Sequence, residues 1–205
     1  MDDIQKRQIV TEAKAFWDRG YPQKAGMLIF ERIALEHRAN WAANILVFAY
    51  RHIDPIPEID TVLQFAKHPD LWSRDQRNEA HGIFDAVYTR TTRLSERDLF
   101  VGLVSQLAEH TAAIAYTSTQ KWDCFDHSRG WDIADVLSKN IKYLQLDEAV
   151  AWQTLANERY ILLDEPIICH RGCPICQLPM WDYLSNIKQS KMADNKELTA
   201  SSASA

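Results

Sequence analysis

The chain has 205 residues, of which 46% are hydrophobic and 25% charged, values that are ordinary for a globular protein with one large domain. It has only six glycines and seven prolines, which argues against an all-β sandwich or barrel, since those folds need many turns. The formal net charge is -5 and no basic stripe is visible, so we expect no nucleic-acid partner.

Apolar residues in the first third recur with the period of an α-helix. The pattern predicts helices that are separated by breaks at Gly20 to Pro22 and at Asp54 to Pro57, because proline opens a helix well but cannot continue one. These predicted helices cover about residues 3–18, 22–37, 39–51 and 57–67.

The rest of the chain continues the helical pattern, with a polar, irregular stretch at 118–130. The apolar segment 161–168 is short and predicts either a strand or an extended lead-in. The small polar residues of 191–205 predict a disordered tail. The remaining predicted helices cover about residues 73–89, 95–114, 131–143, 147–160 and 179–189.

These elements predict an all-α fold, either an irregular helical bundle or a short α-solenoid of helical hairpins. We expect a helical-hairpin body over 1–117. A helical C-terminal region over 118–190 packs on that body as part of one domain, and the disordered tail follows it. Part of the C-terminal region is expected to be irregular and stapled by a metal.

Three of the four cysteines lie within eight residues, as Cys169, Cys173 and Cys176, and the fourth is Cys124. Two residues between cysteines let both sulfurs reach one metal, and a set of thiolates selects zinc or an iron–sulfur cluster. The predicted ligands of a metal site, with zinc favoured, are Cys124, Cys169, Cys173 and Cys176, with His127 or His170 as alternative ligands. An iron–sulfur cluster, a redox-active cysteine pair and unliganded thiols remain open.

Four protein ligands would close the coordination shell of a zinc ion, so the predicted role of the site is structural. The sequence contains no phosphate-binding loop, dinucleotide fingerprint or metalloprotease motif. The first hypothesis is therefore a non-enzymatic protein-binding or regulatory protein with a structural zinc site and a protein partner. The second is a redox- or metal-responsive regulator with an iron–sulfur cluster. A weaker third is a thiol-dependent enzyme that uses Cys124 with His127.

The N-terminal residues Met1 to Lys6 are polar and acidic, unlike the apolar core of a signal peptide. The longest apolar stretch, 41–50, is interrupted by Asn44 and is too short to span a bilayer. We therefore expect a cytoplasmic chain without membrane contact, in a reducing compartment where thiols stay free or bind metal. Five histidines, His110 among them, are scattered along the predicted helices and are interpreted as ordinary core or surface imidazoles.

Overall fold

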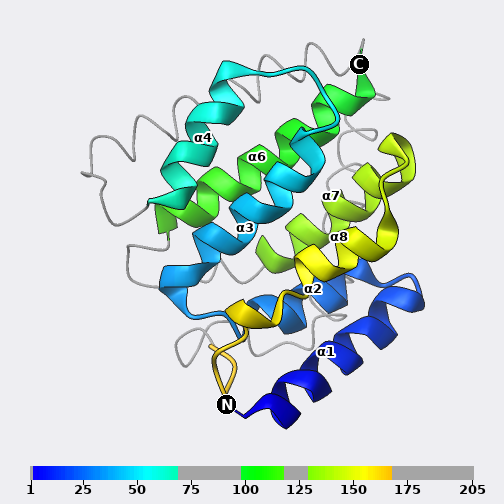
Figure 1. Cartoon of the computed structure of the whole chain (residues 1–205), viewed down its shortest axis with the longest axis vertical. Helices are drawn as coiled ribbons and strands as arrows, with labels where there is room; N and C mark the ends of the chain where they lie inside the picture. The colour runs from blue at the N-terminus through cyan, green and yellow to red at the C-terminus, as the bar shows by residue number, and fades with distance from the viewer. Residues whose placement is uncertain (1, 69–97, 118–128, 168–205) are drawn as a thin grey trace, which may run out of the picture. The chain divides into compact units, whose positions relative to one another are not determined.

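The computed structural model describes residues 2–68, 98–117 and 129–167. Within these ranges the chain forms α-helices, one 3₁₀ turn and one isolated β-bridge, which confirms the all-α prediction (Figure 1). The helices are α1 (Asp3–Asp18), α2 (Pro22–Phe30), α3 (Leu35–Tyr50), α4 (Pro57–Lys67), α6 (Leu99–Thr117), α7 (Arg129–Leu144) and α8 (Glu148–Leu155), followed by the 3₁₀ turn η3 (Glu158–Tyr160).

Helix α1 begins at a capping box. The Asp2 carboxylate accepts a hydrogen bond from the Gln5 backbone N–H at 2.7 Å, and the Gln5 side chain accepts one from the Asp2 backbone N–H at 3.0 Å. The chain turns at Gly20, whose φ of 80° is a conformation that glycine adopts without strain. Pro22 then opens α2 at its first helical position, as the sequence predicts.

The predicted single helix over 22–37 is wrong, because α2 ends at Phe30 and α3 begins at Leu35. The turn between them is held by a distant segment of the chain. Ile33 forms an antiparallel bridge with Ile161, and the Arg32 carbonyl accepts hydrogen bonds from the backbone N–H groups of Leu162 and Leu163. This tertiary pairing overrides a local sequence that has no helix breaker.

The other helices lie close to their predicted places. Predicted helices over 57–67 and 131–143 correspond to α4 and α7, and the helix predicted to start near 95 is observed from Leu99. The helix predicted over 147–160 is divided into α8 and η3. Four predictions fall outside the described residues or at their edge and stay predictions: the helices over 73–89 and 179–189, the tail, and the boundary at 117/118.

The core joins helices that are far apart in the sequence. Helix α2 packs mainly on α7, and α3 contacts α4, α6 and α8 (Figure 1). Trp41 of α3 is fully buried, and its indole N–H donates to the Leu155 carbonyl at 2.8 Å. A solenoid unit contacts only its neighbours, so pairing across about a hundred residues is packing of the bundle kind.

The contact between α2 and α7 is unusually close. A methyl group added at Gly26 would lie 2.2 Å from the Gly130 carbonyl oxygen and 2.4 Å from the Ala134 Cβ. A methyl group at Gly130 would lie 2.3 Å from the Phe30 Cβ. Glycine at both positions therefore lets the two backbones touch.

Within the described ranges, no helix is both long enough and apolar enough to cross a membrane.

Candidate functional site

All six predicted metal ligands lie outside the described residues. Cys124 and His127 belong to 118–128, and Cys169, His170, Cys173 and Cys176 belong to 168–205. Among residues 2–68, 98–117 and 129–167, no group of histidine, cysteine, aspartate and glutamate side chains is arranged to hold a metal. The metal site therefore stays a prediction. The structure describes the residues that adjoin the two cysteine-bearing segments, up to Ile167 and from Arg129.

The described ends of these two segments reach adjacent residues of the α2 C-terminus. Helix α7 begins two residues after His127, and its Gly130 backbone lies against Phe30. At the other end, the Ile167 backbone N–H donates to the Glu31 carbonyl at 2.9 Å. Because Phe30 and Glu31 are consecutive, the chain leaves the described structure before Cys169, and re-enters it after Cys124, close to the same point.

The segment that leads to Cys169 is held firmly before it leaves. The backbone N–H groups of Leu162 and Leu163 donate to the Arg32 carbonyl at 3.0 and 3.1 Å, and the Arg32 guanidinium donates to the Asp164 carbonyl. Burial raises the pKa of the Glu31 carboxyl, an effect that Arg32 and Arg38 oppose. Of the two predictions for 161–168, the extended lead-in with a single bridge is the observed one up to residue 167.

A partly buried histidine links the two helices that flank the Cys124 segment. The His110 side chain on α6 is 14% exposed, and an Arg129 Nη1–H donates to its Nδ1 at 3.2 Å. Since guanidinium has no acceptor, Nδ1 is the unprotonated nitrogen and the ring proton lies on Nε2. The carboxylate of Asp132 lies 3.9 Å from both Nδ1 and Arg129 Nη1.

This environment keeps the imidazole of His110 neutral. Burial, and after it the Arg129 charge, lower its pKa to about 4, and Asp135 opposes the shift. A neutral ring whose one lone pair is taken by arginine is a poor general acid and a weak base at neutral pH. The contact therefore serves to hold α7 against α6 rather than to move protons.

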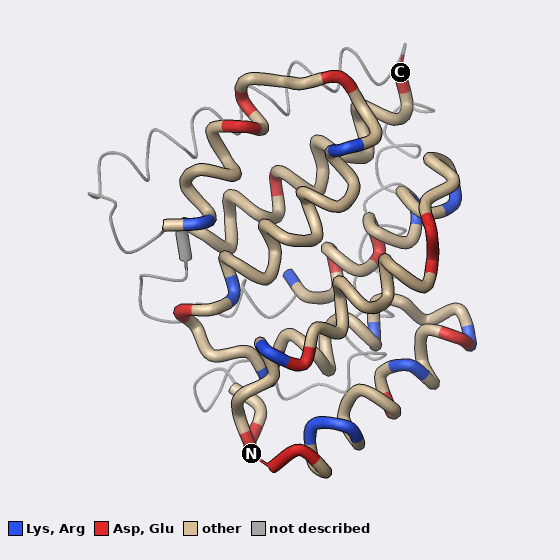
Figure 2. The backbone as a smooth tube through the Cα atoms, in the orientation of Figure 1, with Lys and Arg blue, Asp and Glu red and all other residues tan. Residues whose placement is uncertain are grey.

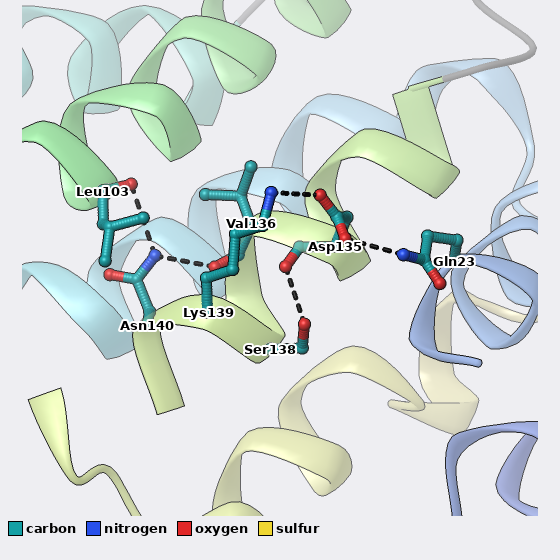
Figure 3. A network of polar contacts seen from close by, with 7 residues as sticks. All are labelled: Gln23, Leu103, Asp135, Val136, Ser138, Lys139 and Asn140. Atoms are coloured by element: carbon teal, nitrogen blue, oxygen red, sulfur yellow. Dashed lines mark hydrogen bonds and ion pairs between the residues drawn. The ribbon is translucent and has the colours of Figure 1, made fainter. Parts of the chain in front are cut away.

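Side-chain hydrogen bonds on α7 tie it to α2 and α6 (Figure 3). Asp135 accepts from the Gln23 amide at 2.7 Å and from Lys139 Nζ at 2.6 Å. Asn140 is fully buried, and its amide nitrogen donates to the Leu103 carbonyl at 3.3 Å and to the Val136 carbonyl at 2.9 Å. These groups fix the position of α7, whose first residues follow the Cys124 segment.

The sequence pattern did not single out His110 among the other scattered histidines. Its partner Arg129 lies nineteen positions later, across an irregular stretch, so no helical spacing connects the two residues. The one signal was that Arg129 lies in the same polar, irregular stretch, 118–130, as Cys124 and His127.

No family model, curated protein or solved structure matches this chain. Its function therefore has to be argued from its own residues.

Proposed function

We propose that this chain is a non-enzymatic protein-binding or regulatory protein whose C-terminal region is held by a structural zinc site. The proposed ligands are Cys124, Cys169, Cys173 and Cys176. The observation that supports it best is the approach of the two described chain ends to Phe30 and Glu31.

The covalent reach of the chain agrees with this proposal. Cys124 precedes Gly130 by six residues and Cys169 follows Ile167 by two. An extended chain spans at most about 3.6 Å per residue, so Cys124 can lie at most about 22 Å from Gly130, and Cys169 at most about 7 Å from Ile167. These tethers are long enough for one tetrahedral metal to take a ligand from each segment.

The described polar contacts of α6 and α7 support a structural role over a catalytic one. His110, Arg129, Asp135 and Asn140 each bond to a neighbouring helix or to the backbone of their own helix. A metal that joined the two segments would add a strong link to a part of the chain that these hydrogen bonds already hold in position. Since metal binding is coupled to folding, such a link would be worth several kcal/mol.

Metal analysis of the full chain, purified without oxygen, tests the zinc site. We expect one zinc per chain and a colourless solution. A brown, iron-containing sample would instead favour the iron–sulfur regulator, and protein with neither metal would refute the metal site.

X-ray absorption then tests the ligand set. Four sulfurs at about 2.3 Å are expected for the proposed ligands, whereas three sulfurs and one nitrogen would point to His127 or His170. Cys173→Ser should lose zinc and melt at a lower temperature, with Ser128→Ala as the control that keeps both. An unchanged melting curve for Cys173→Ser would contradict a structural role.

The binding half of the proposal is tested with a random-peptide display library, screened on the zinc-loaded full chain. We expect a consensus peptide to be enriched and to bind the chain in solution. A library that yields no binder would count against a peptide-binding function. Turnover of a thiol ester by the wild-type chain but not by Cys124→Ala would support the thiol-enzyme alternative.

A further inference from the structure

A groove of about 320 Å³ lies between α3 and the α8–η3 segment. Arg51, directly after α3, and Arg159 of η3 are both exposed and both line it. No aspartate or glutamate is among the described residues that line this groove. Elsewhere, as along α1, acidic and basic positions are interspersed (Figure 2). A lining with arginine as its only charged residue is therefore a local exception in a chain of net charge -5.

The two arginines stand at opposite ends of the groove. Asn44 and Arg159 both donate to the Tyr160 hydroxyl, which places the Arg159 guanidinium beside Asn44. Arg51 lies seven residues after Asn44, at the other end of the α3 stretch that lines the groove. Seven residues of helix rise about 10 Å, which is the length of the α3 stretch between these two ends of the groove.

The two guanidinium groups differ in how they are held. Arg159 is stacked on the Tyr160 ring, 4.4 Å from its centroid, and is fixed before any ligand arrives. The Arg51 backbone N–H donates to the Ala49 carbonyl, but the side chain makes no hydrogen bond or ion pair with the described part of the chain, so the guanidinium donors are free for a ligand. Guanidinium offers a planar fork of N–H donors that matches a carboxylate.

The remaining lining suits a peptide. The amide of the exposed Gln153, and the amide groups that Asn44 and Asn157 do not already use on Tyr160 and Arg159, supply donors and acceptors of the kind that pair with a peptide backbone. Phe48 and the 42% exposed Val150 add apolar surface for a side chain. A nucleic acid would need more positive charge than two arginines on an acidic chain.

We propose that this groove binds an extended, acidic peptide segment of a partner protein. In the extended polyproline II conformation, carboxylates three residues apart lie on the same face of the peptide, about 9 Å from each other, which is close to the rise along α3 between Asn44 and Arg51. One carboxylate pairs with Arg51 and the other with Arg159. This inference rests on the proposed protein-binding function and names where the partner binds and what its chemistry is.

The test uses two fluorescein-labelled peptides of the same composition, with the zinc-loaded full chain and fluorescence anisotropy. One peptide has two glutamates three positions apart, and the other has them adjacent. We expect the spaced peptide to bind at least severalfold more tightly, with an affinity that falls as salt is raised. Equal binding of both peptides, or of a lysine peptide of the same spacing, would overturn the proposal.

Variants locate the binding site. Arg51→Gln and Arg159→Gln should each weaken binding of the spaced peptide about two- to fivefold, as is usual for exposed charge pairs, and the double variant about tenfold. Arg7→Gln, which removes an exposed arginine from α1, is the matched control and should leave binding unchanged. Arg159→Gln removes a contact with Tyr160 and can lower stability. The Arg51 side chain makes no hydrogen bond or ion pair with the described residues, so Arg51→Gln tests peptide binding without that complication.

The outcomes separate this inference from the broader function. If the library-selected peptide binds but the double variant binds it within twofold of wild type, the groove is wrong and protein binding stands. If neither that peptide nor the spaced acidic peptide binds the wild-type chain, both proposals fall. Shifts of the Asn44, Gln153 and Asn157 side-chain amide signals on adding the spaced peptide would support the groove directly.

Discussion

Gly26→Ala, at the crossing of α2 and α7, is the most direct test of the fold. The new methyl group would lie 2.2 Å from the Gly130 carbonyl oxygen and 2.4 Å from the Ala134 Cβ. The first of these atoms is backbone and cannot rotate away. Because favourable contacts lie at about 3.5–4.0 Å, the two helices must separate by about 1–2 Å.

The expected loss follows from two opposing effects. Overpacking a well-packed contact costs about 1–3 kcal/mol, and a clash with backbone lies at the upper end of that range. Alanine is a better helix former than glycine by about 1 kcal/mol, which offsets part of the cost. We expect a net destabilisation of about 2 kcal/mol, or about 4–8 °C in Tm for a chain of this size.

Urea unfolding followed by tryptophan fluorescence and by circular dichroism measures this change. Adding Ala134→Gly removes one of the two clashes but leaves the one with the Gly130 carbonyl. The double variant should therefore be more stable than the sum of the single effects predicts, by about 0.5 kcal/mol or more. A Gly26→Ala chain as stable as wild type, or more stable, would show that the helices do not approach as closely as described.

Three further predictions concern buried or partly buried polar groups. The pKa of His110 in the folded chain lies below its unfolded value of about 6.5, so the unfolded chain binds a proton there at a higher pH than the folded chain does. The free energy of unfolding should therefore fall by up to about 3 kcal/mol as the pH drops from about 6.5 to 4. His110→Gln should remove that part of the pH profile. Trp41→Phe leaves the Leu155 carbonyl without its donor and should cost about 1–3 kcal/mol in urea unfolding, whereas an unchanged midpoint would mean that the bond contributes nothing. Asn140→Asp buries a carboxylate and should lose about 3 kcal/mol or more at neutral pH, less in acid, whereas Asn140→Leu should stay within about 1 kcal/mol of wild type; equal losses would contradict this account.

Sequence patterns were enough for elements whose ends are marked locally. Pro22 and Pro57 each open the helix they predict, and Gly20 turns the chain between α1 and α2. The break between α2 and α3 was missed because Glu31 to Ala34 contain no glycine or proline. Pairing with a segment about 130 residues later sets that break, and local periodicity carries no information on it.

The site divides in the same way. The cysteine spacing predicts a metal, since ligand type and separation are local properties of the sequence. The link between His110 and Arg129 depends on how α6 and α7 pack, and the arginine groove depends on α3 meeting α8 and η3. Both needed the three-dimensional arrangement, because His110 and Arg129 are 19 positions apart and Arg51 and Arg159 are 108 apart.

The close crossing of α2 and α7 also has a consequence for how the chain is made. Gly26 leaves the ribosome 104 residues before Gly130 (130 minus 26), a delay of about 5–20 s at usual rates of synthesis. During that interval Ile29 and Phe30, fully or almost fully buried in the finished protein, have no α7 to pack on. The nascent N-terminal third therefore exposes these apolar side chains until α7 has emerged, and we expect chaperones to bind it during that interval.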